Sequence, residues 1–316
     1  MKKKNYFLGI LFIILPIFAY LMISTIVSTC VQVIYIAKIY MNGIPSYITD
    51  GTELTVYLTE ELLKTDYTGC ATFFADLVGA IVAFFWMRSL KNYDLPCKNV
   101  FNIKRVIGLI SFGIFIQIAS GLLINFVFML LPTEVSESYT LLAETLTGDE
   151  TSVFMFLAVV IMAPVCEEFF LRGLALQYGR KYMSDTLSVI LTSVAFGLIH
   201  LSNVSIAGIS GTLVQVVYAC VYGVLLAVVR IKFKTVWSSV LVHFSINGFG
   251  EIISLFLNDT DYGMLVMVIV MIFSAVLSVL LYKKAGVPTE KTVAEIYNAH
   301  DIDTNMVYDN DTDGVV

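Results

Sequence analysis

The chain has 316 residues, of which 58% are hydrophobic and 14% charged, and its mean hydropathy is +0.84. Soluble domains carry about 25% charged residues, so the composition excludes an ordinary soluble domain and indicates a polytopic membrane protein. The net charge of −6 without a basic patch gives no sign of nucleic-acid binding, and five cysteines without a Cys-x-x-Cys pair exclude a disulfide framework and a zinc knuckle.

The chain contains eight stretches that are apolar enough to cross a bilayer, which requires roughly 20 residues each. The first follows Lys2-Lys3-Lys4 and is far longer than the apolar region of a signal peptide. We therefore expect a membrane span there, tilted or interrupted near Pro16. The sequence predicts an all-α, polytopic fold of about eight transmembrane helices. The predicted spans are 6–37, 70–88, 107–131, 152–178, 186–201, 206–229, 236–257 and 263–282.

The basic residues gather on one side of these spans. If the amino terminus is cytoplasmic, the inner segments hold 16 of the 19 basic residues, and the outer loops 41–69 and 132–151 are rich in acids. Lys and Arg are enriched in cytoplasmic loops. We therefore predict an integral, multi-pass protein of a bacterial cell membrane, with both termini cytoplasmic.

The chain divides into three predicted regions. Residues 1–106 hold the first two spans with their loops, and residues 107–284 form a core of six spans with an intramembrane chamber. Residues 285–316 form a polar, acidic tail, which we expect to be disordered and cytoplasmic.

Two adjacent glutamates stand inside the fourth span, where ionisable side chains are costly and mark functional candidates. Glu168 and Arg172 are four residues apart, so on a helix they share a face and can form an ion pair. Glu167 is turned by about 100° from Glu168 and has no partner on its own helix. We therefore expect Glu168 and Arg172 to be structural and Glu167 to be free for chemistry. We interpret the preceding Cys166 as a small core residue, because apolar surroundings disfavour a reactive thiolate.

Two histidines and an asparagine occur in later spans. His243 and Asn247 are four residues apart and share a helix face, while His200 follows Phe196 by four. At about 1.5 Å per residue, Glu167, His200 and Asn247 all lie about 20–22 Å from the inner ends of their helices. The pattern predicts that the three helices bring these polar side chains together in one chamber. We interpret Phe196 as a packing residue.

These residues form three motifs, Glu-Glu-x-x-x-Arg at 167–172, Phe-x-x-x-His at 196–200 and His-x-x-x-Asn at 243–247. In this order they resemble the CAAX-protease and bacteriocin-processing (CPBP) family, also called the Abi family, of intramembrane endopeptidases. The resemblance covers residues 151–250, and no motif position departs from the family pattern. It implies a mostly eight-span fold. Eukaryotic members cut prenylated CAAX tails, and many bacterial members are tied to bacteriocin maturation, immunity or peptide signals.

The resemblance also implies roles for the individual residues. Glu167 and His200 would activate a water, His243 and Asn247 would donate hydrogen bonds to the oxyanion, and the ion pair of the first motif would orient the site. This division suits amide hydrolysis, which needs an acid–base group and preorganised donors for the developing negative charge. We expect a peptide or membrane-protein substrate within the lipid bilayer and no cofactor.

Two alternatives of other classes remain open. In the first, Glu167, His200 and His243 are zinc ligands of a metalloprotease, because two histidines and one glutamate make an adequate catalytic zinc set. The His-Glu-x-x-His helix signature is absent from the sequence, although other zinc geometries exist. In the second, the chain is a non-enzymatic immunity factor or scaffold that keeps the motifs as structure.

Overall fold

The computed structural model describes residues 5–90, 101–147, 152–257 and 263–288, and within these ranges the chain is helical without any strand. Asn5 caps the first helix by accepting a hydrogen bond from the Leu8 N–H. The elements in chain order are α1 (Tyr6–Met41), α2 (Gly51–Leu63), α3 (Tyr67–Ser89), α5 (Ile103–Phe128), α6 (Thr133–Thr147), α7 (Val153–Leu157), the π-helical segment η1 (Ala158–Met162), α8 (Ala163–Glu168), the π-helical segment η2 (Phe169–Ala175), α9 (Leu176–Tyr182), α10 (Asp185–Ile199), the 3₁₀ turn η3 (His200–Asn203), α11 (Val204–Phe233), α12 (Val236–Leu257) and α13 (Gly263–Ala285).

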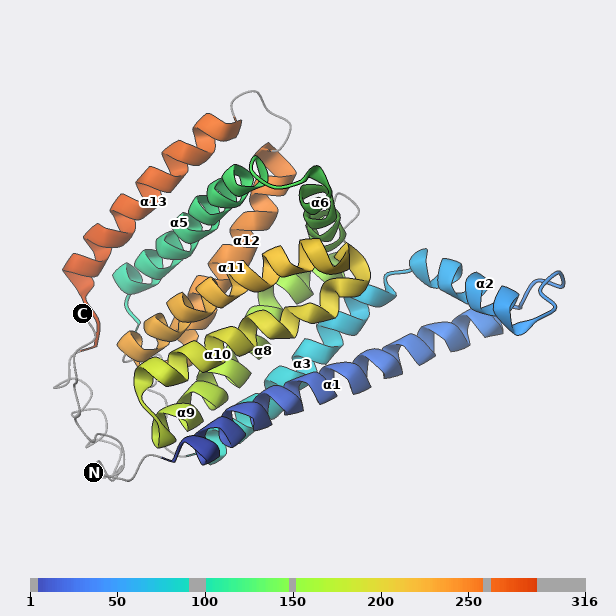
Figure 1. The fold of residues 1–316 in the computed structure, drawn as a ribbon, viewed down its shortest axis with the longest axis horizontal. Helices are drawn as coiled ribbons and strands as arrows, with labels where there is room; N and C mark the ends of the chain where they lie inside the picture. The colour runs from blue at the N-terminus through green and yellow to red at the C-terminus, as the bar shows by residue number, and fades with distance from the viewer. Residues whose placement is uncertain (1–4, 91–100, 148–151, 258–262, 289–316) are drawn as a thin grey trace.

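The all-α membrane architecture predicted from the sequence is confirmed. Six helical stretches within the described residues are long and apolar enough to cross a membrane. One of these, Asp185–Phe233, contains both α10 and α11, which fold back on each other after η3 (Figure 1). Each predicted span overlaps a helical stretch, while the number of eight crossings stays a prediction.

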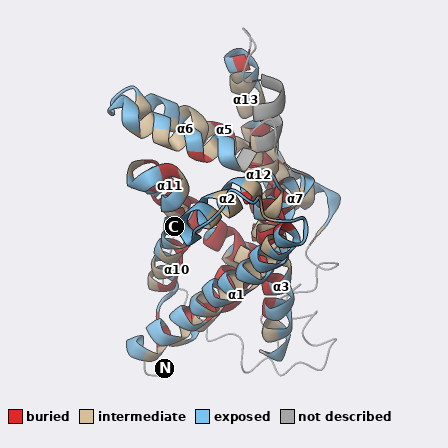
Figure 2. Cartoon of the chain, turned by 90° about the vertical axis from the view of Figure 1, so that its right-hand side faces the viewer, coloured by how far each residue is buried: buried red, intermediate tan, exposed pale blue. Residues whose placement is uncertain are grey.

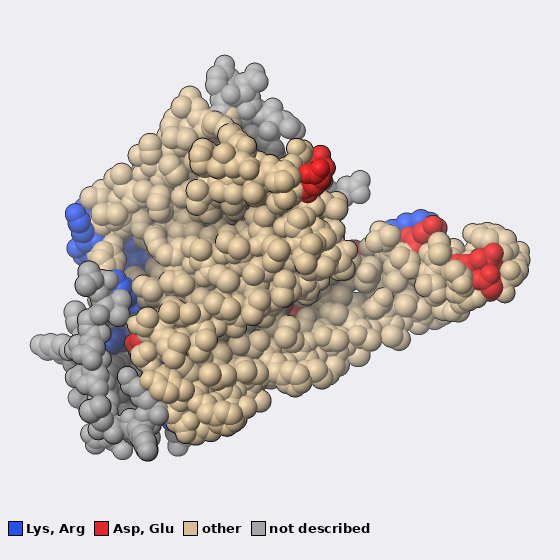
Figure 3. All heavy atoms as spheres, viewed as in Figure 1, with Lys and Arg blue, Asp and Glu red and all other residues tan. Residues whose placement is uncertain are grey.

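Helices α1, α5, α11 and α13 slant across the molecule in a similar direction, and α1 begins on the same side on which α13 ends (Figure 1). Lys and Arg side chains gather mainly at this end of the molecule, and acidic side chains are conspicuous at the opposite end near α2 and α6 (Figure 3). Each of the two predicted outer loops contains a helix, α2 in loop 41–69 and α6 in loop 132–151. Asp50 caps α2 by accepting hydrogen bonds from the N–H groups of Thr52 and Glu53.

The first helix is continuous over 36 residues, so the predicted interruption near Pro16 is not present. Proline is tolerated inside transmembrane helices, because neighbouring groups and local adjustments satisfy the carbonyl that loses its donor. The ring of Phe12 stacks on Tyr178 and Tyr182 with centroid distances of 5.3 Å, which packs α1 against α9.

Small residues bring α3 close to the helix that carries the first motif. Ala75, Gly79 and Ala83 are buried at intervals of four residues. A Cβ atom on Gly79 would lie 2.6 Å from the Cys166 Sγ, so only glycine allows this approach. Close packing through small residues is the usual way in which transmembrane helices associate. Cys166 is fully buried at this contact, as expected for a core residue.

Burial is concentrated around the helices of the motifs, whereas much of α1 and α6 is exposed (Figure 2). All seven residues of η2 are buried. On the basic side, Arg180 joins α9 to α10 through two hydrogen bonds of 2.8 and 2.9 Å to Asp185, an ion pair that remains partly exposed. The tail beyond residue 288 lies outside the described residues, and the predicted division of the chain at residues 106 and 284 stays a prediction.

Candidate active site

The first motif stands on a continuous helical stretch, 153–182, that contains two π-helical segments. In η1 the N–H of Ala163 bonds to the carbonyl of Ala158, five residues earlier. The next donor in this register would be residue 164, which is proline and has no N–H. The Val159 carbonyl receives its hydrogen bond instead from the Asn247 side chain on α12, with an Nδ2–O distance of 2.8 Å. The asparagine of the third motif is thus positioned by an irregularity in the helix of the first.

The glutamate and arginine of the first motif form a fully buried ion pair. The Arg172 Nη1 lies 2.7 Å from the Glu168 Oε1, and both side chains are excluded from solvent. The Arg172 Nη2 also donates to the Gly223 carbonyl on α11 at 3.2 Å. Its guanidinium lies 4.5 Å from the centre of the Phe196 ring, a cation–π contact. This pair therefore links the motif helix to α10 and α11.

His243 lies between the two glutamates, a relationship that the sequence did not predict. Its Nδ1 is 3.1 Å from the same Glu168 Oε1 that binds Arg172, and its Nε2 is 3.8 Å from the Glu167 Oε2. The Glu167 side chain is 12% exposed, whereas that of Glu168 is completely buried. Glu168 therefore fixes the imidazole ring, and the ring turns its other nitrogen towards the more accessible glutamate.

His200 ends α10 and begins the 3₁₀ turn η3. Its Nδ1 lies 3.1 Å from the Phe196 carbonyl oxygen. Since a carbonyl only accepts hydrogen bonds, Nδ1 carries the proton, and Nε2 of the neutral ring keeps a lone pair that can accept one. Glu167 and His200 are not hydrogen-bonded to each other among the described side chains.

The Phe196 ring packs against several polar side chains of the site. It meets the rings of His200 and His243 edge to face, with centroid distances of 5.2 and 5.7 Å, and it also supports Arg172. Phe196 itself is 1% exposed. This aromatic ring thus fills the space that the second motif shares with the first and third, and it shields the ion pair from water.

Asp76 on α3 is a further acidic residue at the site, and the sequence analysis missed it. The residue is 4% exposed, lies next to the Cys166 thiol and interacts electrostatically with Glu167. Its signal in the sequence is a single acid within the apolar run from Phe73 to Val78. An ionisable residue inside a span marks a functional candidate, and Asp76 meets this criterion in the second predicted span.

A metal site is not formed by the described side chains. Within these residues no group of three or more His, Cys, Asp or Glu side chains is arranged to hold a metal ion. Of the set that zinc would require, Glu167 and His243 lie 3.8 Å apart through Oε2 and Nε2, and His200 is held through Nδ1 by the Phe196 carbonyl. We therefore derive no catalytic step through zinc.

The comparison with protein families identifies the region in which this geometry lies. Residues 149–249 match the family described as Rce1-like, type II CAAX prenyl endopeptidase. This segment is CAAX-protease-like. The match spans all three motifs and confirms the resemblance seen in the sequence, and it indicates a CAAX-protease-type peptidase that acts on a membrane-associated substrate. No curated protein and no solved structure matched the chain.

The CAAX-protease-like segment runs from just before α7 to Phe249 on α12. It thus contains the buried ion pair, both histidines and the asparagine. Asp76 on α3 lies outside the segment, although it is next to the motif helix. The immediate surroundings of Glu167 are therefore completed by a helix that the family match does not cover.

Proposed function

We propose that the chain is an intramembrane endopeptidase that hydrolyses a peptide bond of a membrane-associated or small peptide substrate with a water activated by Glu167 and His200. The observation that carries this proposal is the position of His243, whose ring lies within 3.1 Å of Glu168 and 3.8 Å of Glu167. The histidine of the third motif thus contacts the two adjacent glutamates of the first motif, although these motifs lie far apart along the CAAX-protease-like segment.

The first step of the proposed mechanism is the activation of water. Glu167 accepts a proton from the water, whose oxygen then attacks the carbonyl carbon of the scissile bond. His200 orients the water through its Nε2, because its Nδ1–H is held by the Phe196 carbonyl. The proton taken from water is afterwards passed to the leaving amine, which breaks the carbon–nitrogen bond.

The second part of the mechanism is the stabilisation of the oxyanion. One N–H of the Asn247 amide is directed to the Val159 carbonyl at 2.8 Å, which fixes the amide and leaves its other N–H for the oxyanion. His243 donates from Nε2 when its ring carries both protons, with Nδ1–H held by Glu168. Donors that are fixed before the reaction need no reorganisation as the negative charge develops.

The experiment that tests this proposal compares the peptides of cells that produce the wild-type chain with those of cells that produce Glu167→Gln. Glutamine keeps the shape of the side chain but cannot accept a proton. The matched control is Glu60→Gln, which changes an exposed acid on α2. We expect Glu167→Gln to abolish at least one cleaved peptide and to accumulate its precursor at unchanged protein level, while Glu60→Gln behaves as wild type.

The same comparison separates the peptidase from a non-enzymatic immunity factor or scaffold. If the peptides of Glu167→Gln cells equal those of wild type while an immunity phenotype persists, the chain acts without hydrolysis and the proposal is wrong. A peptide found in this way then becomes the substrate for assays with purified protein.

A further inference from the structure

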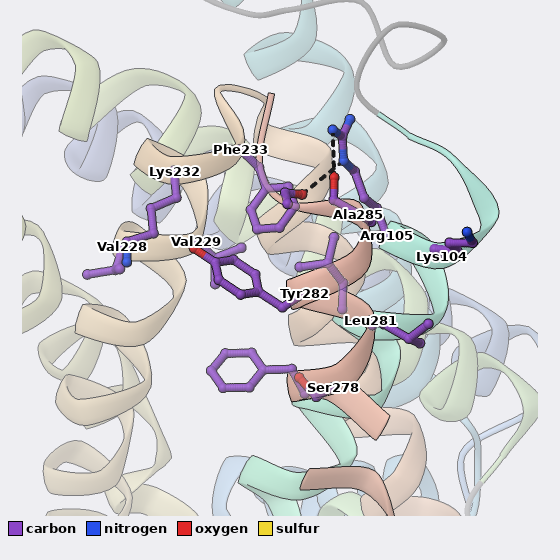
Figure 4. A pocket seen from close by; sticks show the side chains of 14 residues that line it. Lys104, Arg105, Val228, Val229, Lys232, Phe233, Ser278, Leu281, Tyr282 and Ala285 are labelled. Carbon is purple, nitrogen blue, oxygen red and sulfur yellow. Dashed lines mark hydrogen bonds between the residues drawn. The ribbon is translucent and has the colours of Figure 1, made fainter. Parts of the chain in front are cut away.

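A cavity that contains none of the motif residues lies at the basic end of the molecule between α5, α11 and α13 (Figure 4). Its volume is about 220 Å³. In the close-up view the rings of Phe233 and Tyr282 lie in the space between Val229 on α11 and Leu281 on α13. The walls are therefore mainly apolar, as expected for a site that takes a hydrocarbon chain.

The charges around this cavity have one sign. Three cationic residues line it, Lys104, Arg105 and Lys232, and none of the lining residues is acidic. Lys104 and Lys232 are exposed. Arg105 donates from Nε to the Gly286 carbonyl at 3.0 Å and from Nη2 to the Ala285 carbonyl at 3.1 Å, so it also ties the end of α13 to the start of α5.

The cavity occupies the place where a lipid headgroup would meet the protein. It lies at the ends of membrane-spanning helices, on the side where the basic residues gather (Figure 3). Helix α13 packs mainly on α5, and the cavity separates it from α11. Basic pockets between transmembrane helices on the cytoplasmic side are typical sites for anionic headgroups.

We propose that this cavity binds one anionic glycerophospholipid of the membrane, with an acyl chain along Phe233 and Tyr282 and the phosphate at the cationic rim to which Lys104 and Lys232 belong. The apolar wall excludes a free phosphate ion as the preferred ligand, and the cationic rim disfavours a lipid without net charge. The bound lipid fills the cavity between α11 and α13 and thereby holds α13 to the other helices. This inference does not depend on the proposed peptidase activity.

The test is native mass spectrometry of the full-length protein in detergent, titrated with phosphatidylglycerol or phosphatidylcholine. We expect phosphatidylglycerol to bind in a one-to-one complex and to raise the thermal unfolding midpoint, with phosphatidylcholine and inorganic phosphate having little effect. The double variant Lys104→Gln/Lys232→Gln should bind phosphatidylglycerol roughly thirtyfold more weakly, because each basic residue near an anionic surface contributes about fivefold.

Two further variants make the result specific to the cavity. Lys283→Gln/Lys284→Gln removes the same charge from exposed positions on the last turn of α13 that do not line the cavity, so binding should stay near wild type. Val229→Trp fills the cavity without changing charge and should abolish the one-to-one complex, with circular dichroism as the check on folding. The proposal is overturned if phosphatidylcholine binds equally well, if inorganic phosphate displaces the lipid, if the Lys283/Lys284 variant loses as much affinity, or if folded Val229→Trp binds normally.

Discussion

Replacing Arg172 by alanine would leave the Glu168 carboxylate without its cationic partner in a position that solvent does not reach. The ion pair of 2.7 Å is the shortest contact of Glu168, and the guanidinium also binds the Gly223 carbonyl and the Phe196 ring. Breaking a buried pair by removing one partner typically costs about 3–5 kcal/mol. Because domains are stable by only about 5–15 kcal/mol, we expect Arg172→Ala to lower both the amount of folded protein and its activity.

The assay measures the protein level in membranes and the unfolding midpoint of the purified protein in detergent. The matched control is Arg180→Ala, which breaks a partly exposed ion pair with Asp185 and should cost no more than about 1 kcal/mol. The double variant Glu168→Gln/Arg172→Met removes both buried charges and should be more stable than Arg172→Ala alone. It should nevertheless remain inactive, because the Glu168 carboxylate also fixes His243.

Two results would refute this reasoning. A stable Arg172→Ala protein at normal level but without activity would mean that the guanidinium takes part in catalysis directly. A double variant as unstable as Arg172→Ala would mean that the lost stability comes from packing on Phe196 rather than from an unpaired carboxylate.

The remaining predictions concern the mechanism, the metal, Asp76 and the topology. Glu167→Gln should reduce cleavage to background, whereas Asn247→Ala should lose about 10²–10³ in rate and keep residual cleavage; equal loss in both variants would contradict separate roles. Metal-stripped protein should stay active, and loss of activity that zinc restores, together with lower zinc content in His200→Ala, would make the motif residues ligands. Asp76→Leu should reduce the rate of cleavage at unchanged protein level, because Asp76 interacts with Glu167, while the polar Asp76→Asn should retain more; identical rates in the two variants would mean that a polar side chain at this position does not affect Glu167. A cysteine placed at Glu134 should react with an impermeant maleimide in intact cells, and labelling only after permeabilisation would reverse the predicted orientation.

The contacts within one helix could be predicted from the sequence, because spacing determines which side chains share a helix face. The Glu168–Arg172 pair follows from a separation of four residues, and the structure contains it. Helix geometry also predicts that Glu167 and Glu168 point in different directions. In the structure the two carboxylates differ in exposure. The distances of Glu167, His200 and Asn247 from the inner ends of their helices also predicted that these side chains lie at a similar depth in the membrane. The catalytic roles of these residues stay predictions.

The contacts between helices could not be predicted, because spans that are apolar on every side carry no signal for their rotation. The contact of His243 with both glutamates depends on how α12 is turned towards the motif helix, and the position of Asp76 depends on which face of α3 packs there. The bond between Asn247 and Val159 requires a π-helical register ahead of Pro164, which a pattern of period 3.6 does not reveal.

The length of α1 has a consequence for how the protein sits in its membrane. A helix of 36 residues is about 54 Å long, whereas the hydrocarbon layer measures about 30 Å. Even at a tilt of about 40°, the upper end of the usual range, roughly 15 Å of the helix must stand outside the hydrocarbon. Since Phe12 stacks on Tyr178 and Tyr182, any change in the inclination of α1 is shared with the helix that carries Glu167. A thicker bilayer favours a more upright α1 and a thinner one a more inclined α1, so bilayer thickness itself becomes a variable that sets the depth of Glu167.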